Sequence, residues 1–79
     1  MMCQLAQEAI HEAKPDQRAF VVTRSGHAGL QRYAQTWAGD NFTSWISLKY
    51  NIATILGMGL CGVSNMGCDI GGFYGPAPE

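Results

Sequence analysis

Charged residues are scarce in this sequence. Lysine, arginine, aspartate and glutamate make up 14% of the 79 residues, whereas hydrophobic residues make up 47%. Soluble domains usually carry a charge at about 25% of their positions. A chain this short also buries only a modest fraction of its surface. We therefore expect apolar surface that something else covers.

Two classes of partner lack their sequence signals. Five basic and six acidic residues are spread along the chain, with a net charge of −1 and no basic stripe, so nucleic acid is not expected as a partner. The longest candidate for a membrane span, residues 52–63, contains three glycines and falls short of the roughly 20 residues that a spanning helix needs. No membrane partner is expected either.

Cysteines are few, and their number is odd. They stand at positions 3, 61 and 68, without the C-x-x-C or cysteine–histidine spacing of a zinc site. This pattern indicates reduced thiols in an intracellular protein, and no metal or other cofactor is predicted. The N-terminus lacks the basic start and unbroken apolar run of a signal peptide. We therefore expect a cytoplasmic location.

The residues that are present predict a short α/β chain. Apolar positions at helical spacing predict a helix over residues 2–13, which Pro15 ends. A second helix is predicted from Trp45 to about Met58, with Ser44 as its N-cap. Apolar and β-branched runs predict three strands, over residues 19–23, 33–37 and 62–66.

The second predicted helix carries an apolar stripe. Its members recur at intervals of three and four residues, as on one face of a helix: Trp45, Leu48, Ile52, Ile55 and Leu56. We expect this face, with Trp45 in it, to pack into the core.

The connection between the first two predicted strands is short. Only residues 24–32 separate them, and a parallel crossover usually needs a dozen or more residues. Local rules therefore predict an antiparallel hairpin there. The helix between the second and third strands instead predicts a parallel crossover.

A charged residue follows each predicted strand. Arg24, Asp40 and Asp69 come after the first, second and third strand. Functional groups gather at the C-terminal ends of strands in parallel α/β architectures, so these side chains can converge on one pocket. Each also has an ordinary interpretation. The Asp of Gly-Asp-Asn is a common turn or capping residue, an Asp before Ile-Gly-Gly can simply shape a turn, and an arginine after a strand often lies on the surface.

Two aromatic residues accompany these charged residues. Trp37 ends the second predicted strand just before Asp40, and Phe73 follows Asp69. A flat aromatic ring offers an apolar face on which the apolar face of a sugar can stack. Trp37 and Phe73 are therefore candidate walls of a sugar pocket.

Taken together, these residues resemble glycoside hydrolase family 31, the family of α-glucosidases and α-xylosidases. The resemblance runs from Arg18 to Glu79 and rests on motifs in the family's order and spacing: R-x-F-V-V-T-R-S-G at 18–26, Q-R-Y-A at 31–34, W-x-G-D-N at 37–41 and G-x-S-x-x-G-x-D-I-G-G-F at 62–73. The family's catalytic domain is a (β/α)₈ TIM barrel. The resemblance implies that residues 1–79 are an α/β fragment of that barrel, about strands 5–7 with two flanking helices. It also implies that the first two strands run parallel.

The resemblance further implies a role for each candidate residue. Asp40 matches the family's general acid/base, and Arg24 matches an arginine that contacts the hydroxyls of the bound sugar. Asp69 matches an aspartate that holds this arginine in the pocket. Trp37 and Phe73 match residues that line the sugar pocket.

One catalytic part of the family has no match in this sequence. The family's nucleophile lies in a W-x-D-M-N-E type motif, which does not occur here. The resemblance therefore implies part of a retaining exo-α-glycosidase, most simply an α-glucosidase, acting on an α-linked oligosaccharide or glycoside. The remainder of the barrel is its expected partner, and the chain alone is expected to be inactive. The alternative is a non-catalytic carbohydrate-binding or structural α/β module.

Overall fold

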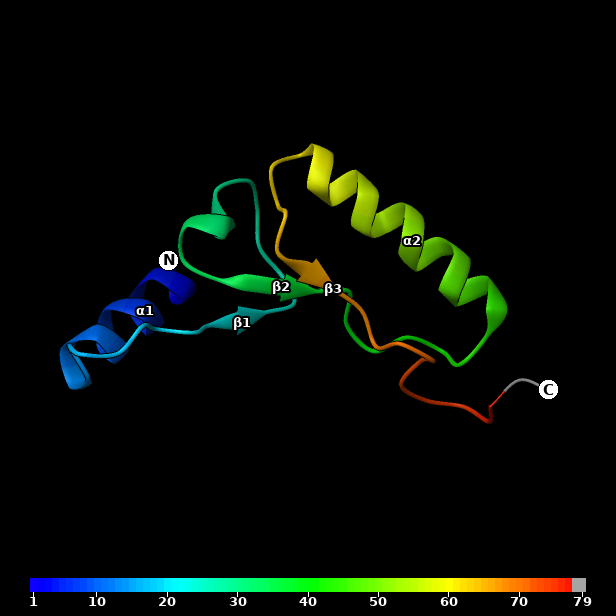
Figure 1. Ribbon diagram of the computed structural model, residues 1–79, viewed down its shortest axis with the longest axis horizontal. Coiled ribbons are helices and arrows are strands. Elements are labelled where there is room, and N and C mark those ends of the chain that lie inside the picture. Colours follow the sequence, from blue (N-terminus) through cyan, green and yellow to red (C-terminus); the bar gives the residue numbers. More distant parts are fainter. Residues whose placement is uncertain (78–79) are drawn as a thin grey trace.

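The computed structural model describes residues 1–77; Pro78 and Glu79, the last residues of the expected barrel fragment, lie outside the described part. Two α-helices and three short strands follow one another as helix, strand, strand, helix, strand, with a 3₁₀ helix between the first two strands (Figure 1). In chain order the elements are α1 (Met2–Ala13), β1 (Val22–Thr23), η1 (Leu30–Arg32), β2 (Gln35–Trp37), α2 (Trp45–Leu60) and β3 (Met66–Gly67).

The three strands form one parallel sheet in the order β1-β2-β3. The hairpin that local rules predict between β1 and β2 is therefore wrong, and the parallel arrangement that the family resemblance implies is confirmed. Two features let residues 24–34 return the chain from the end of β1 to the start of the parallel strand β2 without a long crossover. The strands to be spanned are only two and three residues long, and η1 reverses the chain, with the Ala34 N–H donating to Leu30 O at 3.0 Å.

The two helices begin and end close to their predicted bounds. α1 ends at Ala13, where the Lys14 N–H donates to Ile10 O at 2.8 Å just before Pro15. α2 begins at Trp45, and the Oγ of Ser44 accepts a hydrogen bond from the Ser47 N–H at 3.1 Å. The predicted N-cap is thus confirmed, and α2 runs two residues past the predicted end.

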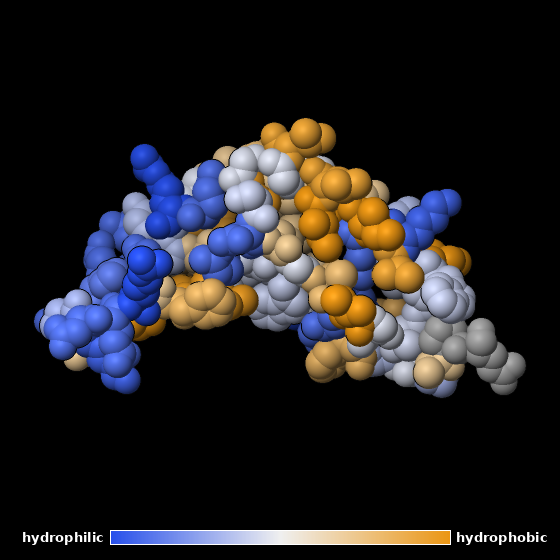
Figure 2. Space-filling model, viewed as in Figure 1, coloured by the Kyte–Doolittle hydropathy of each residue, from blue (hydrophilic) through white to orange (hydrophobic). Residues whose placement is uncertain are grey.

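The face of α2 that turns away from solvent differs from the predicted stripe. Its least exposed positions are Ser47, Asn51, Ile55 and Met58, whereas Trp45 is 67% exposed and Leu56 is 65% exposed. The expectation that Trp45 lies in the core of this chain is therefore wrong. At 100° per residue the packed face lies about 100° around the helix from the stripe. Apolar residues occur on nearly all sides of α2 in the sequence, and Figure 2 shows apolar side chains along the part of α2 that faces the viewer, so periodicity alone could not select the packed face.

The core of the described chain is small. Leu30, Ala34 and Val63 are its buried hydrophobic residues. The accessible surface is 6188 Å², against about 4,700 Å² for a compact folded protein of this mass. α2 packs against one side of the sheet, and within residues 1–77 no helix covers the opposite side (Figure 1). The fold is thus an open α/β arrangement rather than a closed domain.

Neither α1 nor α2, the α-helices of residues 1–77, is long and apolar enough to cross a membrane.

Candidate active site

The three charged residues that follow the predicted strands lie at one edge of the sheet. Arg24 directly follows β1, Asp40 comes shortly after β2, and Asp69 comes two residues after β3. Because the strands are parallel, their C-terminal ends meet at the same edge. The structure therefore brings these three segments together as the sequence predicts.

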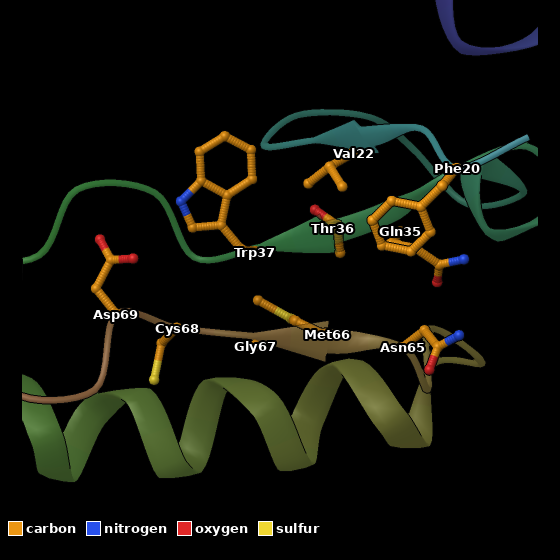
Figure 3. A pocket seen from close by; sticks show the side chains of 10 residues that line it. All are labelled: Phe20, Val22, Gln35, Thr36, Trp37, Asn65, Met66, Gly67, Cys68 and Asp69. Carbon is orange, nitrogen blue, oxygen red and sulfur yellow. The ribbon is translucent and has the colours of Figure 1, made fainter. Parts of the chain in front are cut away.

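A hollow opens on the side of the sheet that α2 does not cover. In the register of the sheet Val22 pairs with Gln35 and Trp37 pairs with Gly67, so these residues share one face. Together with Asp69 they line a cavity of about 610 Å³. Figure 3 shows Trp37 and Asp69 at the same end of this hollow, the end toward which the strands point. Two of the predicted sugar-binding residues thus face one space.

Arg24 lies against the segment that carries Asp40. A Cβ built on Gly39 would be 3.9 Å from Arg24 Cδ, so the arginine stem passes next to the residue before Asp40. Arg24, Trp37 and Asn41 also line a second cavity, of about 490 Å³. Trp37 lines both cavities and so links the surroundings of Arg24 with those of Asp69.

Asp69 is the most enclosed of the candidate charged groups. Its Oδ2 atom is buried and has no hydrogen-bond partner in the described part of the chain. The same residue borders a further cavity of about 230 Å³ beside Ser47 and Asn51 of α2. The pairing of Asp69 with Arg24 that the family resemblance implies stays a prediction.

The side chains of Asp40 and Phe73 lie outside the hollow of Trp37 and Asp69. Asp40 is exposed, and Phe73 is 63% exposed. Their backbones are nevertheless neighbours, because the Phe73 N–H donates to Asn41 O at 2.7 Å. The structure brings their segments together, while their catalytic and sugar-binding roles stay predictions.

Sequence reasoning missed three polar residues of the hollow, Gln35, Thr36 and Asn65. Gln35 stands two positions before Trp37, so the two-residue period of a strand was a signal that it shares the face of Trp37. Asn65 directly precedes β3. The sequence predicts this strand over residues 62–66, whereas β3 is Met66–Gly67, so the predicted strand did not indicate which side chains face the hollow.

Within residues 1–77 the structure gathers no group of three His, Cys, Asp or Glu side chains that could hold a metal ion. The chemistry available at this sheet edge is that of carboxylates, a guanidinium, amides and aromatic rings.

A comparison with models of protein families shows to which family this chain belongs. All of residues 1–79 match the model described as the glycosyl hydrolases family 31 TIM-barrel domain. The chain belongs to glycoside hydrolase family 31. The open parallel sheet with its two helices is accordingly a part of the family 31 barrel.

Curated relatives of this family 31 chain bear the names of glucosidases. The alpha-glucosidase of Saccharolobus solfataricus is 52% identical over 56 residues, which are 71% of this chain and 8% of that protein. Neutral alpha-glucosidase C of Homo sapiens is 44% identical over 70 residues, 89% of this chain and 8% of that protein. The probable glucan 1,3-alpha-glucosidase of Oryza sativa subsp. japonica is 48% identical over 63 residues, 78% of this chain and 7% of that protein. The chain thus spans less than a tenth of the length of the relatives it matches.

Proposed function

We propose that this chain is the part of a retaining exo-α-glucosidase that carries the general acid/base, Asp40, and part of the sugar pocket. The observation that carries the proposal is the position of Arg24, Asp40 and Asp69 after the C-terminal ends of three neighbouring parallel strands in a family 31 barrel segment. Catalytic groups of TIM barrels occupy this end of the strands. The names of the three relatives support an α-glucoside as the substrate.

The proposed chemistry uses two carboxyl groups. In a retaining glycosidase these groups lie about 5–5.5 Å apart on either side of the scissile bond. The Asp40 carboxyl donates a proton to the glycosidic oxygen as the nucleophile attacks the anomeric carbon. The Asp40 carboxylate then accepts a proton from the water that hydrolyses the glycosyl-enzyme. The nucleophile belongs to a part of the barrel outside this sequence.

The other candidates hold the sugar. The Arg24 guanidinium offers planar N–H donors to sugar hydroxyls and to a carboxylate, for which Asp69 is the proposed partner. Trp37 offers an aromatic wall beside Asp69 in the hollow, and Phe73 offers a second ring from the segment after β3.

A chimeric enzyme tests the proposal. This chain replaces the matching segment of the Saccharolobus solfataricus alpha-glucosidase, so that the host supplies the rest of the barrel. Two substrates are compared through kcat/KM: maltose, whose leaving alcohol needs a proton, and α-glucosyl fluoride, whose fluoride leaves with little need of one. The Asp40→Asn variant is expected to lose about 10²–10⁴-fold on maltose, the usual contribution of a general acid, and much less on α-glucosyl fluoride.

Asp16→Asn is the matched control, because Asp16 is an exposed aspartate in the turn after α1, away from the strand ends. It is expected to change neither value. The proposal fails if the folded chimera cleaves neither substrate, or if Asp40→Asn leaves maltose hydrolysis at the level of Asp16→Asn.

A further inference from the structure

The segment after β3 folds back onto the segment that follows Asp40. The Phe73 and Tyr74 N–H groups both donate to Asn41 O, at 2.7 and 3.2 Å, and the Thr43 N–H donates to Tyr74 O at 2.8 Å. Phe42 and Tyr74 form an isolated parallel bridge. We call this pairing of residues 41–43 with residues 72–74 the clasp. It fixes the backbone immediately after Asp40 from a part of the chain that is distant in sequence.

The clasp depends on the fact that residue 72 is a glycine and has no side chain. A Cβ at this position would lie 2.5 Å from Thr43 Cα and 2.8 Å from Thr43 N. Both neighbours are backbone atoms, which cannot swing aside as the tip of a side chain can. Gly72 also has φ of +90°, which L side chains rarely adopt. Any larger residue must therefore push the two segments apart.

A pair of aromatic rings also joins the two segments of the clasp. The Phe42 and Tyr74 rings meet edge to face, with centroids 5.4 Å apart. Such a pair contributes beyond the area that it buries. The Asp40 side chain is exposed, so its position follows from the backbone to which it is attached.

We propose that Gly72 is a positioning residue for Asp40, because its lack of a side chain lets the clasp close against Thr43 and set the place of the Asp40 carboxyl. This inference rests on the proposed function. Displacing a catalytic group by about 1 Å can cost about 10²-fold in rate. Loosening the clasp should therefore impair proton transfer by Asp40 more than it impairs sugar binding.

The chimera tests the inference with two neighbouring glycines. Gly71 has φ of +89°, nearly the same as Gly72, but a Cβ there would meet no atom within 4 Å. Gly71→Ala and Gly72→Ala thus share the backbone strain, and Gly72→Ala alone adds the collision with Thr43. The measured quantity is the ratio of kcat/KM on maltose to kcat/KM on α-glucosyl fluoride. A merely smaller folded fraction lowers both values equally and leaves this ratio unchanged.

We expect Gly72→Ala to lower the ratio about 10²-fold and Gly71→Ala to keep the ratio of the unmodified chimera. Phe42→Ala gives a second variant that adds no atoms and removes the ring pair. It is expected to lower the ratio in the same direction by a smaller factor. If Gly72→Ala does not yield folded protein, the kcat/KM ratio of Phe42→Ala tests the inference in its place.

Two results would overturn the inference. One is an unchanged kcat/KM ratio in Gly72→Ala or, where that variant does not fold, in Phe42→Ala. The other is a ratio that falls as far in Gly71→Ala as in Gly72→Ala. Asp40→Asn separates this failure from that of the proposed function. A lowered ratio in Asp40→Asn with an unchanged ratio in Gly72→Ala and Phe42→Ala rejects only the positioning role. An unchanged ratio in Asp40→Asn rejects the acid/base assignment itself.

Discussion

Asp69 has a carboxylate oxygen that the described chain does not satisfy. Its Oδ2 atom is buried and accepts no hydrogen bond within residues 1–77. A buried charged acceptor without a donor carries a desolvation cost that exceeds that of a neutral polar group. We therefore expect a donor to reach Oδ2 in the closed barrel, and Arg24, at the same sheet edge, is the predicted one.

The planar guanidinium of Arg24, with its parallel N–H donors, gives a prediction at the scale of the residue. Arg24→Lys keeps the positive charge but cannot offer two parallel N–H groups to a carboxylate and a sugar hydroxyl. Losing one hydrogen bond to a charged group costs about 1.5–3 kcal/mol, so kcat/KM of the chimera on maltose should fall roughly 10- to 150-fold. Arg32→Lys, in the exposed end of η1, serves as the control. Equal values for the two variants would contradict a sugar-binding role for Arg24.

Some residue positions could be predicted from the sequence because they depend only on local runs. Arg24, Asp40 and Asp69 each follow a short apolar segment, which predicts a position after a strand, and in the structure each one follows a strand. Which side chains share a cavity could not be predicted in the same way. Gln35 lies across from Val22 only through the register between two strands, and register is a property of the paired sheet.

Helix ends were more predictable than strand ends. The Pro15 stop and the Ser44 N-cap are local chemical signals, and they fix the end of α1 and the start of α2. β1 and β3 are only two residues long, shorter than the apolar runs predicted, because a strand extends only as far as its neighbour pairs with it. The packed face of α2 was mispredicted because the bulkiest apolar residues of the helix face away from this sheet.

The N-cap of α2 gives a prediction at the scale of the element. Ser44→Ala removes the acceptor of the Ser47 N–H and should cost about 1 kcal/mol of local helix stability. In the chimera the first-turn amides of α2 should then exchange with deuterium about 5-fold faster. Ser64→Ala, at an exposed serine between α2 and β3, should leave their exchange unchanged. An unchanged rate in Ser44→Ala would show that packing, and not the cap, holds the start of α2.

The whole molecule is extended for its length. Its radius of gyration is 14.9 Å, against about 12 Å for a compact domain of this size. Both β1 and β3 are edge strands of the described sheet, and the predicted stripe of α2 is largely exposed. These surfaces fit a piece of a barrel whose remaining strands and helices cover them.

The isolated chain gives the prediction at the scale of the whole molecule. With three buried hydrophobic residues among residues 1–77, it should show a broad thermal change in circular dichroism without a cooperative transition, and it should bind the dye ANS. The chimera should unfold cooperatively without such dye binding. A sharp transition of the isolated chain would contradict this expectation and favour the alternative of a stand-alone carbohydrate-binding or structural module.

The clasp can form only after both of its segments have been synthesised. Asn41 and Phe73, joined by a backbone hydrogen bond of 2.7 Å, leave the ribosome at different times. At about 5–20 residues per second, Phe73 is added roughly 2–6 s after Asn41. Throughout that interval the segment beside Asp40 lacks the backbone partners that residues 73 and 74 provide. Slower translation between the emergence of Asn41 from the ribosome and that of Phe73 would therefore prolong the time during which a protease can cut the segment that follows Asp40.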